Sequence, residues 1–464
     1  MGVNPEVVRL RHVWGQAVRT IKAVIIFFIA LVAFIRYAPE DGRNPQHITR
    51  TALTISLTEG RLDIDRFARL TVDKAEHDGH FYADKPPGLS LMAVPAVALA
   101  RQVMAAGGND NPDDIVVFVR YVTVATASTV SLLAALAVAV LYLFTRRLGV
   151  SDAAALFGSA ALALGTPFFG WSATFFAHAA TGSLLLFAVA IIGWIDRPSA
   201  WRSAIVGLVL GYLMVVDLTA APAAALVGAW AILRSLSRWQ ALGALALGGA
   251  AGIAPLLVYN ALAFGSPFRL GYAQVVGFEG MKSGLFGVSV PNPVVLGELL
   301  FGHFRGLLPM APVLLLVPFG LVAMLRFGLR GLTVVVAGTI ASYLLINAGY
   351  HYWDGGSSTG PRHLVAMLPL AAVALAFSWP TGVWQRAVVL ALLCVSLVLS
   401  LVAASTEMFA NADFQNPLAD VLLPEFLTPA GFVNAAPVLL HWAAFAVLAF
   451  LRDRSGSKRH QLPA

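Results

Sequence analysis

The sequence has 464 residues and a formal net charge of +7, yet only 12% of its residues are charged and 58% are hydrophobic. A soluble globular protein carries about a quarter charged residues, so this composition excludes a soluble enzyme and a disordered protein. It predicts an all-α polytopic membrane protein. The single cysteine, Cys394, excludes a disulfide framework and a cysteine-ligated metal site. No basic stripe of a soluble module is present, so no nucleic-acid partner is expected.

Apolar runs predict about twelve transmembrane helices. The first follows a basic N-terminal segment and ends at Ile35 without a small-residue cleavage site, so we interpret it as an uncleaved span rather than a signal peptide. The other spans are predicted at 116–144, 152–169, 176–194, 203–217, 219–233, 239–262, 307–325, 331–349, 363–379, 386–405 and 434–451.

Basic residues assign the two sides of the membrane. If the N-terminus is cytoplasmic, short basic connections such as Arg146-Arg147 fall inside together with the basic tail 453–464, as the positive-inside rule requires. The apolar stretch Leu89–Ala100 is short, contains Pro95 and would invert every later span if it crossed. We therefore expect it to be an interfacial helix on the outer side. Residues 1–452 are predicted to form a single transmembrane domain.

The outer segments hold most of the residues that can carry chemistry. They are predicted at 37–115, 264–306, 350–362 and 406–433. An ion-coupled transporter would place ionisable residues within its spans, and here such residues are almost absent. Asp217 is the exception, and we expect it at the outer turn between two short spans. This one-sided distribution favours an enzyme whose site faces outward.

Residues 38–43, Ala-Pro-Glu-Asp-Gly-Arg, directly follow the first span. A carboxylate that is partly desolvated at the lipid boundary can accept a proton from a hydroxyl group. Glu40 and Asp41 are therefore candidate bases, and a solvated loop acid is the alternative interpretation.

Residues 82–88, Tyr-Ala-Asp-Lys-Pro-Pro-Gly, lead into the predicted interfacial helix. The two prolines fix the backbone just after Lys85. A lysine held at head-group level suits a phosphate as a compact point charge. The alternative is an interfacial lysine whose ammonium group simply reaches water.

The segment 350–362 combines aromatic residues, glycines and a final Gly-Pro-Arg. Its aromatic residues with polar tips are typical of a sugar-contacting loop, and Arg362 is suited to bind a phosphate with two hydrogen bonds. An aromatic belt at the membrane surface is the alternative.

Further candidates lie near other predicted outer ends. His178 is placed to bond substrate or a neighbouring helix, Tyr259 precedes a turn, and Arg305 precedes a span on the outer side. The segment 76–80, Glu-His-Asp-Gly-His, has two histidines three positions apart, so a divalent metal is conceivable there. A polar loop without metal is the favoured interpretation.

Several of these segments resemble a known family, the lipid-carrier-dependent glycosyltransferases of the GT-C fold. Asp-Gly-Arg at 41–43 followed by Ile-Thr-Arg at 48–50 is similar to the D-E-x-R-Y-like stretch and the I-x-R helix of the family. Residues 82–87 resemble its Y-x-x-K-P-P element, and 350–362 resembles the last outer loop of many bacterial members. The family includes bacterial aminoarabinose transferases of lipid A and protein O-mannosyltransferases.

The resemblance implies an inverting glycosyltransferase in the bacterial inner membrane, with both termini cytoplasmic and its site facing outward. It would move a sugar from a polyprenyl-phosphate carrier to a hydroxyl of a glycolipid, a cell-envelope polysaccharide or a protein. Asp41 would be the general base. The cations expected at the lipid phosphate are Lys85, Arg362, Arg43 and Arg305. The expected substrate-binding residues are Tyr82, His178, Asp217, Tyr259, His351, Trp353 and Asp354.

Two departures from the family pattern leave alternatives open. Gly42 stands where the family has a second acid, so a metal is not expected to be required. Glu40 directly precedes Asp41 and is therefore a rival base. A lipid-linked-sugar flippase is the alternative from another class, and it predicts polar residues along a whole path through the membrane. A non-catalytic membrane scaffold is the third interpretation.

Overall fold

A computed structural model describes residues 5–38, 44–194 and 199–450. Helices dominate these residues, as the composition predicts. Their bounds are α1 Pro5–Arg36, α2 Pro45–Thr58, α3 Gly88–Ala106, α4 Ile115–Thr126, α5 Leu132–Arg147, α6 Asp152–Leu164, α7 Phe168–Trp171, α8 Ala177–Gly193, α9 Ala200–Val216, α10 Ala221–Ser235, α11 Trp239–Phe264, α12 Pro293–Phe301, α13 Leu307–Met310, α14 Val317–Arg326, α15 Arg330–Ala348, α16 Leu368–Phe377, α17 Val383–Ser405, α18 Leu423–Phe426 and α19 Pro429–Phe450.

The described residues contain eight helices that are long and apolar enough to cross a membrane. Five shorter apolar helices of 10–17 residues accompany them. Each of the twelve predicted spans overlaps one of these thirteen helices, and the chain is a multi-pass membrane protein. The one apolar helix that no predicted span overlaps is α3. The number of helices that cross the membrane therefore stays a prediction.

Helix α3 is longer than the sequence indicated. The expected end at Ala100 is wrong, because the helix continues through Arg101 to Ala106. The charge of Arg101 is compensated within this helix, because its guanidinium is 2.9 Å from the Glu59 carboxylate and 3.3 Å from the Asp110 carboxylate. At 19 residues the helix is also long enough to span. Its interfacial location therefore stays a prediction.

A two-stranded antiparallel hairpin interrupts the otherwise helical fold. Strands β1 (Lys74–His77) and β2 (His80–Ala83) are joined by Asp78 and Gly79, which have positive φ angles of 50° and 80°. An Asp-Gly pair in this conformation makes the tight turn that matches the twist of two paired strands. The prediction of an all-α fold missed this hairpin, although its Asp-Gly turn is a recognised hairpin signal.

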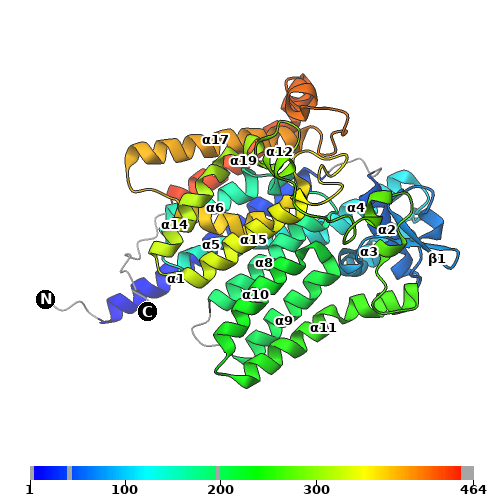
Figure 1. Cartoon of the computed structure of the whole chain (residues 1–464). Coiled ribbons are helices and arrows are strands. Elements are labelled where there is room, and N and C mark those ends of the chain that lie inside the picture. The colour runs from blue at the N-terminus through cyan, green and yellow to red at the C-terminus, as the bar shows by residue number, and fades with distance from the viewer. Residues whose placement is uncertain (1–4, 39–43, 195–198, 451–464) are drawn as a thin grey trace.

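The hairpin lies with α2, α3 and α4 at one end of the molecule, whereas α1 begins at the opposite end (Figure 1). The isolated bridge between Ala75 and Val275 brings the segment that follows α11 against β1. Two segments that are far apart in the sequence, both predicted to be outer, therefore meet at this end.

Helices α9 and α11 run side by side and approach each other at glycines (Figure 1). A Cβ atom at Gly207 would lie 2.1 Å from the carbonyl oxygen of Leu245, and one at Gly248 would lie 2.1 Å from that of Ala204. The two backbones are thus in direct contact, as small residues permit in membrane helices.

A buried ion pair connects α1 to α6. The Lys22 side chain is 1% exposed, and its Nζ donates to Asp152 Oδ2 at 2.5 Å, while Tyr142 OH donates to Asp152 Oδ1 at 2.6 Å. Removing Lys22 leaves a partly buried carboxylate with one partner fewer. We expect Lys22→Met to lower the unfolding free energy by about 2 kcal/mol, measured as a lower melting temperature in detergent. Restoration by Lys22→Met with Asp152→Asn is the control, and an unchanged melting temperature in Lys22→Met would contradict the prediction.

Candidate functional site

Lys85 lies two residues after β2, and its side chain points into the protein at the end of the hairpin. Its Nζ donates to the adjacent Asp84 carboxylate and is 3.8 Å from Asp73 Oδ2. The Asp84 side chain is 1% exposed and that of Lys85 is 19% exposed. Burial lowers the pKa of Lys85, but the two carboxylates outweigh it and hold the pKa above the ordinary value. The ammonium group is therefore permanently charged.

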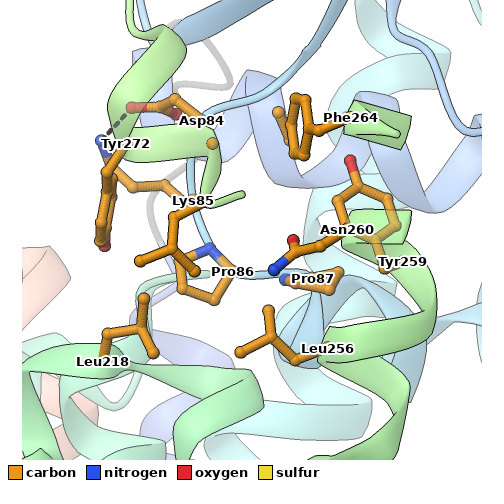
Figure 2. Close-up of a pocket in the computed structure, with 13 residues that line it drawn as sticks. Asp84, Lys85, Pro86, Pro87, Leu218, Leu256, Tyr259, Asn260, Phe264 and Tyr272 are labelled. Atoms are coloured by element: carbon orange, nitrogen blue, oxygen red, sulfur yellow. Dashed lines mark hydrogen bonds and ion pairs between the residues drawn. The ribbon is translucent and has the colours of Figure 1, made fainter. Parts of the chain in front are cut away.

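A pocket of about 250 Å³ opens beside Lys85. We call it the Lys85 pocket. Figure 2 shows Lys85, Asp84 and Tyr272 on one side of it, and Tyr259 and Phe264 of α11 on the other. Its further lining residues are Ala83, Pro86, Pro87, Leu218, Leu256, Asn260, Leu270 and Gly271.

Two tyrosines of the pocket remain neutral hydrogen-bonding groups. The Tyr259 hydroxyl is buried and has no hydrogen-bond partner among the described residues. The Tyr272 ring lies 5.9 Å from the Lys85 ammonium, and burial raises the pKa of this tyrosine. The pocket thus combines the ion pair of Lys85 and Asp84 with neutral and apolar walls.

Arg50 of α2 is a second buried cation at this end of the molecule. It is 3% exposed, and its Nε and Nη1 atoms have no hydrogen-bond partner among the described residues. Burial lowers its pKa, while the charges of Asp217, Asp84 and Asp73 act in the opposite direction. An arginine nevertheless stays protonated in proteins. Its partnerless N–H groups can therefore donate to an anionic ligand.

Arg362 begins the 3-10 helix η7 (Arg362–Met367) and joins the same cluster of charges. Its guanidinium lies 5.2 Å from the Phe176 ring centre, and its Nε atom is buried with no hydrogen-bond partner among the described residues. In the same part of the chain, the Nε2 atom of His363 is also buried with no such partner, and the His363 ring packs 5.5 Å from Tyr350.

Asp217 lies at the C-terminal end of α9, as expected for a turn between two short helices. Its Oδ1 accepts from the Thr219 backbone N–H at 3.0 Å and from the Thr219 hydroxyl at 2.7 Å, and its Oδ2 accepts from Thr181 at 3.4 Å. His178 Nδ1 is 3.8 Å from the same Oδ2, while its Nε2 has no partner in the described part of the chain. The His178 and His363 rings are 5.2 Å apart.

Arg305 supports the segment 350–362 rather than the Lys85 pocket. The residue is completely buried, and its guanidinium donates to the carbonyl oxygens of Asp354 at 2.8 Å, Gly356 at 2.7 Å and Phe304 at 3.2 Å. The Asp354 carboxylate accepts from the Gly356 N–H at 3.2 Å. Arg305 and Asp354, both predicted site residues, therefore stabilise the segment 350–362.

The two aromatic candidates of that loop also lie away from the Lys85 pocket lining. His351 is exposed, its ring packs 4.7 Å from Tyr352, and a Cβ atom at Gly280 would lie 2.2 Å from it. Trp353 packs edge-on against Phe304 at 6.2 Å. The structure brings Lys85 and Tyr259 together at the pocket, but not His351 and Trp353.

Other predicted residues have different positions. Tyr82 of β2 packs its ring 5.2 Å from Phe264, behind the pocket wall. Asp41 and Arg43, with Glu40, lie outside the described residues.

The two histidines of the hairpin do not converge on a common ligand site. His80 Nδ1 is 2.7 Å from Asp65, whereas His77 Nε2 is 3.4 Å from Arg269. Within residues 5–38, 44–194 and 199–450, no group of three metal-binding side chains gathers. In the described part of the chain, the cationic side chains Lys85, Arg50 and Arg362 are available to an anionic ligand.

Sequence reasoning assigned no site role to four members of the cluster: Arg50, which it quoted only within the segment 48–50, Asp73, Tyr272 and His363. Arg50 carried a usable signal, because it is the single charged residue in the helix Pro45–Thr58. A charge in such a segment is costly unless it serves a site. Asp73, Tyr272 and His363 reach the cluster only through the hairpin, the segment after α11 and η7, and no local pattern places them there.

The sequence matches no protein-family model and no curated protein sequence. The structure is similar to that of ArnT from Cupriavidus metallidurans bound to undecaprenyl phosphate, with a TM-score of 0.54 and 15% identity over 92% of this chain and 76% of that one. The apo structure of the same ArnT gives a TM-score of 0.51 and 15% identity over 95% and 77%. The apo oligosaccharyltransferase of Archaeoglobus fulgidus gives 0.46 and 14% over 96% and 61%. ArnT is an aminoarabinose transferase, and the likeness to it identifies the fold of this chain as GT-C.

Proposed function

We propose that this protein is an inverting glycosyltransferase that moves a sugar from a polyprenyl-phosphate carrier to an acceptor hydroxyl on the outer face of the bacterial inner membrane. The observation that carries the proposal is the convergence of Lys85, Arg50 and Arg362 at one end of a GT-C fold. Two of these cations have buried N–H groups with no partner among the described residues. Such preorganised donors suit a lipid phosphate as it becomes a leaving group.

The proposed reaction is a single displacement. The acceptor hydroxyl oxygen attacks the anomeric carbon, the bond from that carbon to the phosphate oxygen breaks, and the electron pair stays on the phosphate. Asp41 takes the hydroxyl proton, as the resemblance implies. Lys85, Arg50 and Arg362 stabilise the charge that develops on the phosphate, so no metal is required. Arg43 remains a further candidate cation.

The sugar is proposed to lie between the Lys85 pocket and the His178–Asp217 pair. Asp217 is held by two threonines and faces His178, whose open Nε2 can bond a sugar hydroxyl. Tyr259 offers a further hydroxyl from the pocket wall. The segment 350–362, held by Arg305, supports this region through Arg362. The acceptor is proposed to be a cell-envelope glycolipid, polysaccharide or protein.

The test uses proteoliposomes and a panel of radiolabelled polyprenyl-phosphate sugars with cell-envelope extract as the acceptor source. Release of polyprenyl phosphate that requires the extract supports the transferase and identifies the donor. Label that crosses the bilayer with its phosphate bond intact would overturn the transferase in favour of the flippase.

The role of Arg50 is open to a binding test that does not need the sugar. Undecaprenyl phosphate at about 100 times its dissociation constant is expected to stabilise the protein by about 2.7 kcal/mol. We expect Arg50→Met to weaken this binding about tenfold, because the loss of one charge-assisted contact costs about 1.4 kcal/mol. The measurement is the rise in melting temperature as the lipid is titrated.

The matched control is Arg61→Met, since Arg61 belongs to the same outer segment, pairs with Asp63 and has a side chain that is 49% exposed. Equal weakening by both substitutions would show that general charge, rather than a contact from Arg50, attracts the lipid.

A further inference from the structure

A second pocket lies between α8, α9, α10 and α11, with an empty volume of about 310 Å³. Arg202 and Ser203 of α9 line it together with Arg234 and Ser235 of α10. Ser203 lies near the start of α9 and Asp217 at its end. At a rise of about 1.5 Å per residue, about 20 Å of helix separates this pocket from the charged cluster. We call it the Arg202–Arg234 pocket, and it is independent of the proposed transfer site.

The pocket gathers hydrogen-bond donors that suit an anion. Ser203 and Ser235 are 7% and 3% exposed, so their hydroxyl groups are held inside the protein beside the two arginines. Ser199 is the residue before α9 and precedes Ser203 by four positions. Its Oγ atom is buried with no partner among the described residues, and it makes no side-chain capping bond. The positive end of the α9 dipole therefore has no side-chain cap from Ser199 and lies within the first turn of the helix, as Arg202 and Ser203 do.

The rest of the lining is aliphatic and includes Val206 of α9 and Leu245 of α11. The two arginines lie close to indole rings: the Arg202 guanidinium is 5.0 Å from the Trp201 ring centre, and that of Arg234 is 5.8 Å from Trp230. Tryptophan and arginine gather where a membrane helix meets the head-group layer. The pocket thus joins a cationic mouth at that level to an apolar interior.

We propose that the Arg202–Arg234 pocket binds an anionic phospholipid. Arg202, Arg234 and the nearby hydroxyl groups bind the head-group phosphate, and an acyl chain packs along Val206 and Leu245. A free phosphate ion would leave the aliphatic lining without a partner, and a zwitterionic lipid would bring its own cation against the arginines. Both compounds therefore bind more weakly than an anionic diacyl lipid.

The experiment is native mass spectrometry of the detergent-solubilised protein titrated with dioleoylphosphatidylglycerol or dioleoylphosphatidylcholine. The wild type is expected to bind one phosphatidylglycerol more tightly than any phosphatidylcholine. Arg202→Gln combined with Arg234→Gln is expected to weaken that binding about tenfold or more, since two charge-assisted contacts are lost. Ser203→Val, which replaces a hydroxyl of the lining with a bulkier apolar group and leaves the charge unchanged, is expected to weaken the same binding.

The matched control is Arg326→Gln combined with Arg386→Gln, which removes two charges at exposed arginines of α14 and α17. The proposal is overturned if phosphatidylglycerol binds the double variant or Ser203→Val as it binds the wild type. Equal weakening by the control variant, or equal binding of both lipids by the wild type, would also overturn it. Displacement of the bound lipid by millimolar inorganic phosphate would assign the pocket to a free anion instead. None of these outcomes depends on transferase activity.

Discussion

Lys85→Met is expected to reduce sugar transfer by about a hundredfold to a thousandfold, the range observed when a preorganised charge-stabilising group is removed from an active site. The substitution takes away the ammonium group that lines the Lys85 pocket. It also leaves the Asp84 carboxylate, which is 1% exposed, without its cation. Loss of one partner of such a pair costs about 3–5 kcal/mol of stability. The measurements are initial rates of polyprenyl phosphate release and the melting temperature.

A second variant separates the two effects. Lys85→Met with Asp84→Asn removes both charges, so the melting temperature is expected to recover while transfer stays low. Recovery of transfer in this double variant would contradict the prediction, because the role of Lys85 would then be limited to pairing with Asp84.

Asp41→Asn is expected to reduce transfer by about a hundredfold to ten-thousandfold, the usual contribution of a general base. The amide has nearly the same volume as the carboxylate but does not accept the hydroxyl proton. Binding of undecaprenyl phosphate is expected to stay unchanged, because the lipid phosphate is bound by the cations. The measurements are the rate at saturating donor and the melting-temperature shift with undecaprenyl phosphate.

Glu40→Gln is the matched control, since it makes the same chemical change at the neighbouring carboxylate. Its transfer rate is expected to stay within a few-fold of the wild type. If Glu40→Gln abolishes transfer and Asp41→Asn does not, Glu40 is the base. If neither reduces transfer, no carboxylate of the segment 38–43 is the base.

Hydropathy and charge predicted the helical membrane fold because a helix in lipid satisfies its backbone hydrogen bonds within its own segment and must carry an apolar surface. The local motif at 82–88 predicted a lysine at head-group level whose backbone is fixed by the two prolines that follow it, since prolines act on adjacent residues. Arg305 shows where this reasoning ends. Its partners are carbonyl groups of the segment 350–362, about fifty positions later, and no local pattern distinguishes such a supporting arginine from a ligand-binding one.

The direct backbone contact between α9 and α11 limits how far these two helices can shift relative to each other. Asp217 follows the end of α9 and Tyr259 lies near the end of α11. No layer of side chains separates the two helices at Gly207, which faces Leu245, or at Gly248, which faces Ala204. Side chains in such a layer would change rotamer and let the helices slide, whereas touching backbones do not. If the sugar lies between the Lys85 pocket and the His178–Asp217 pair, as proposed, this rigid helix pair would not move apart for a larger sugar ring. A donor with a bulkier sugar would then be excluded.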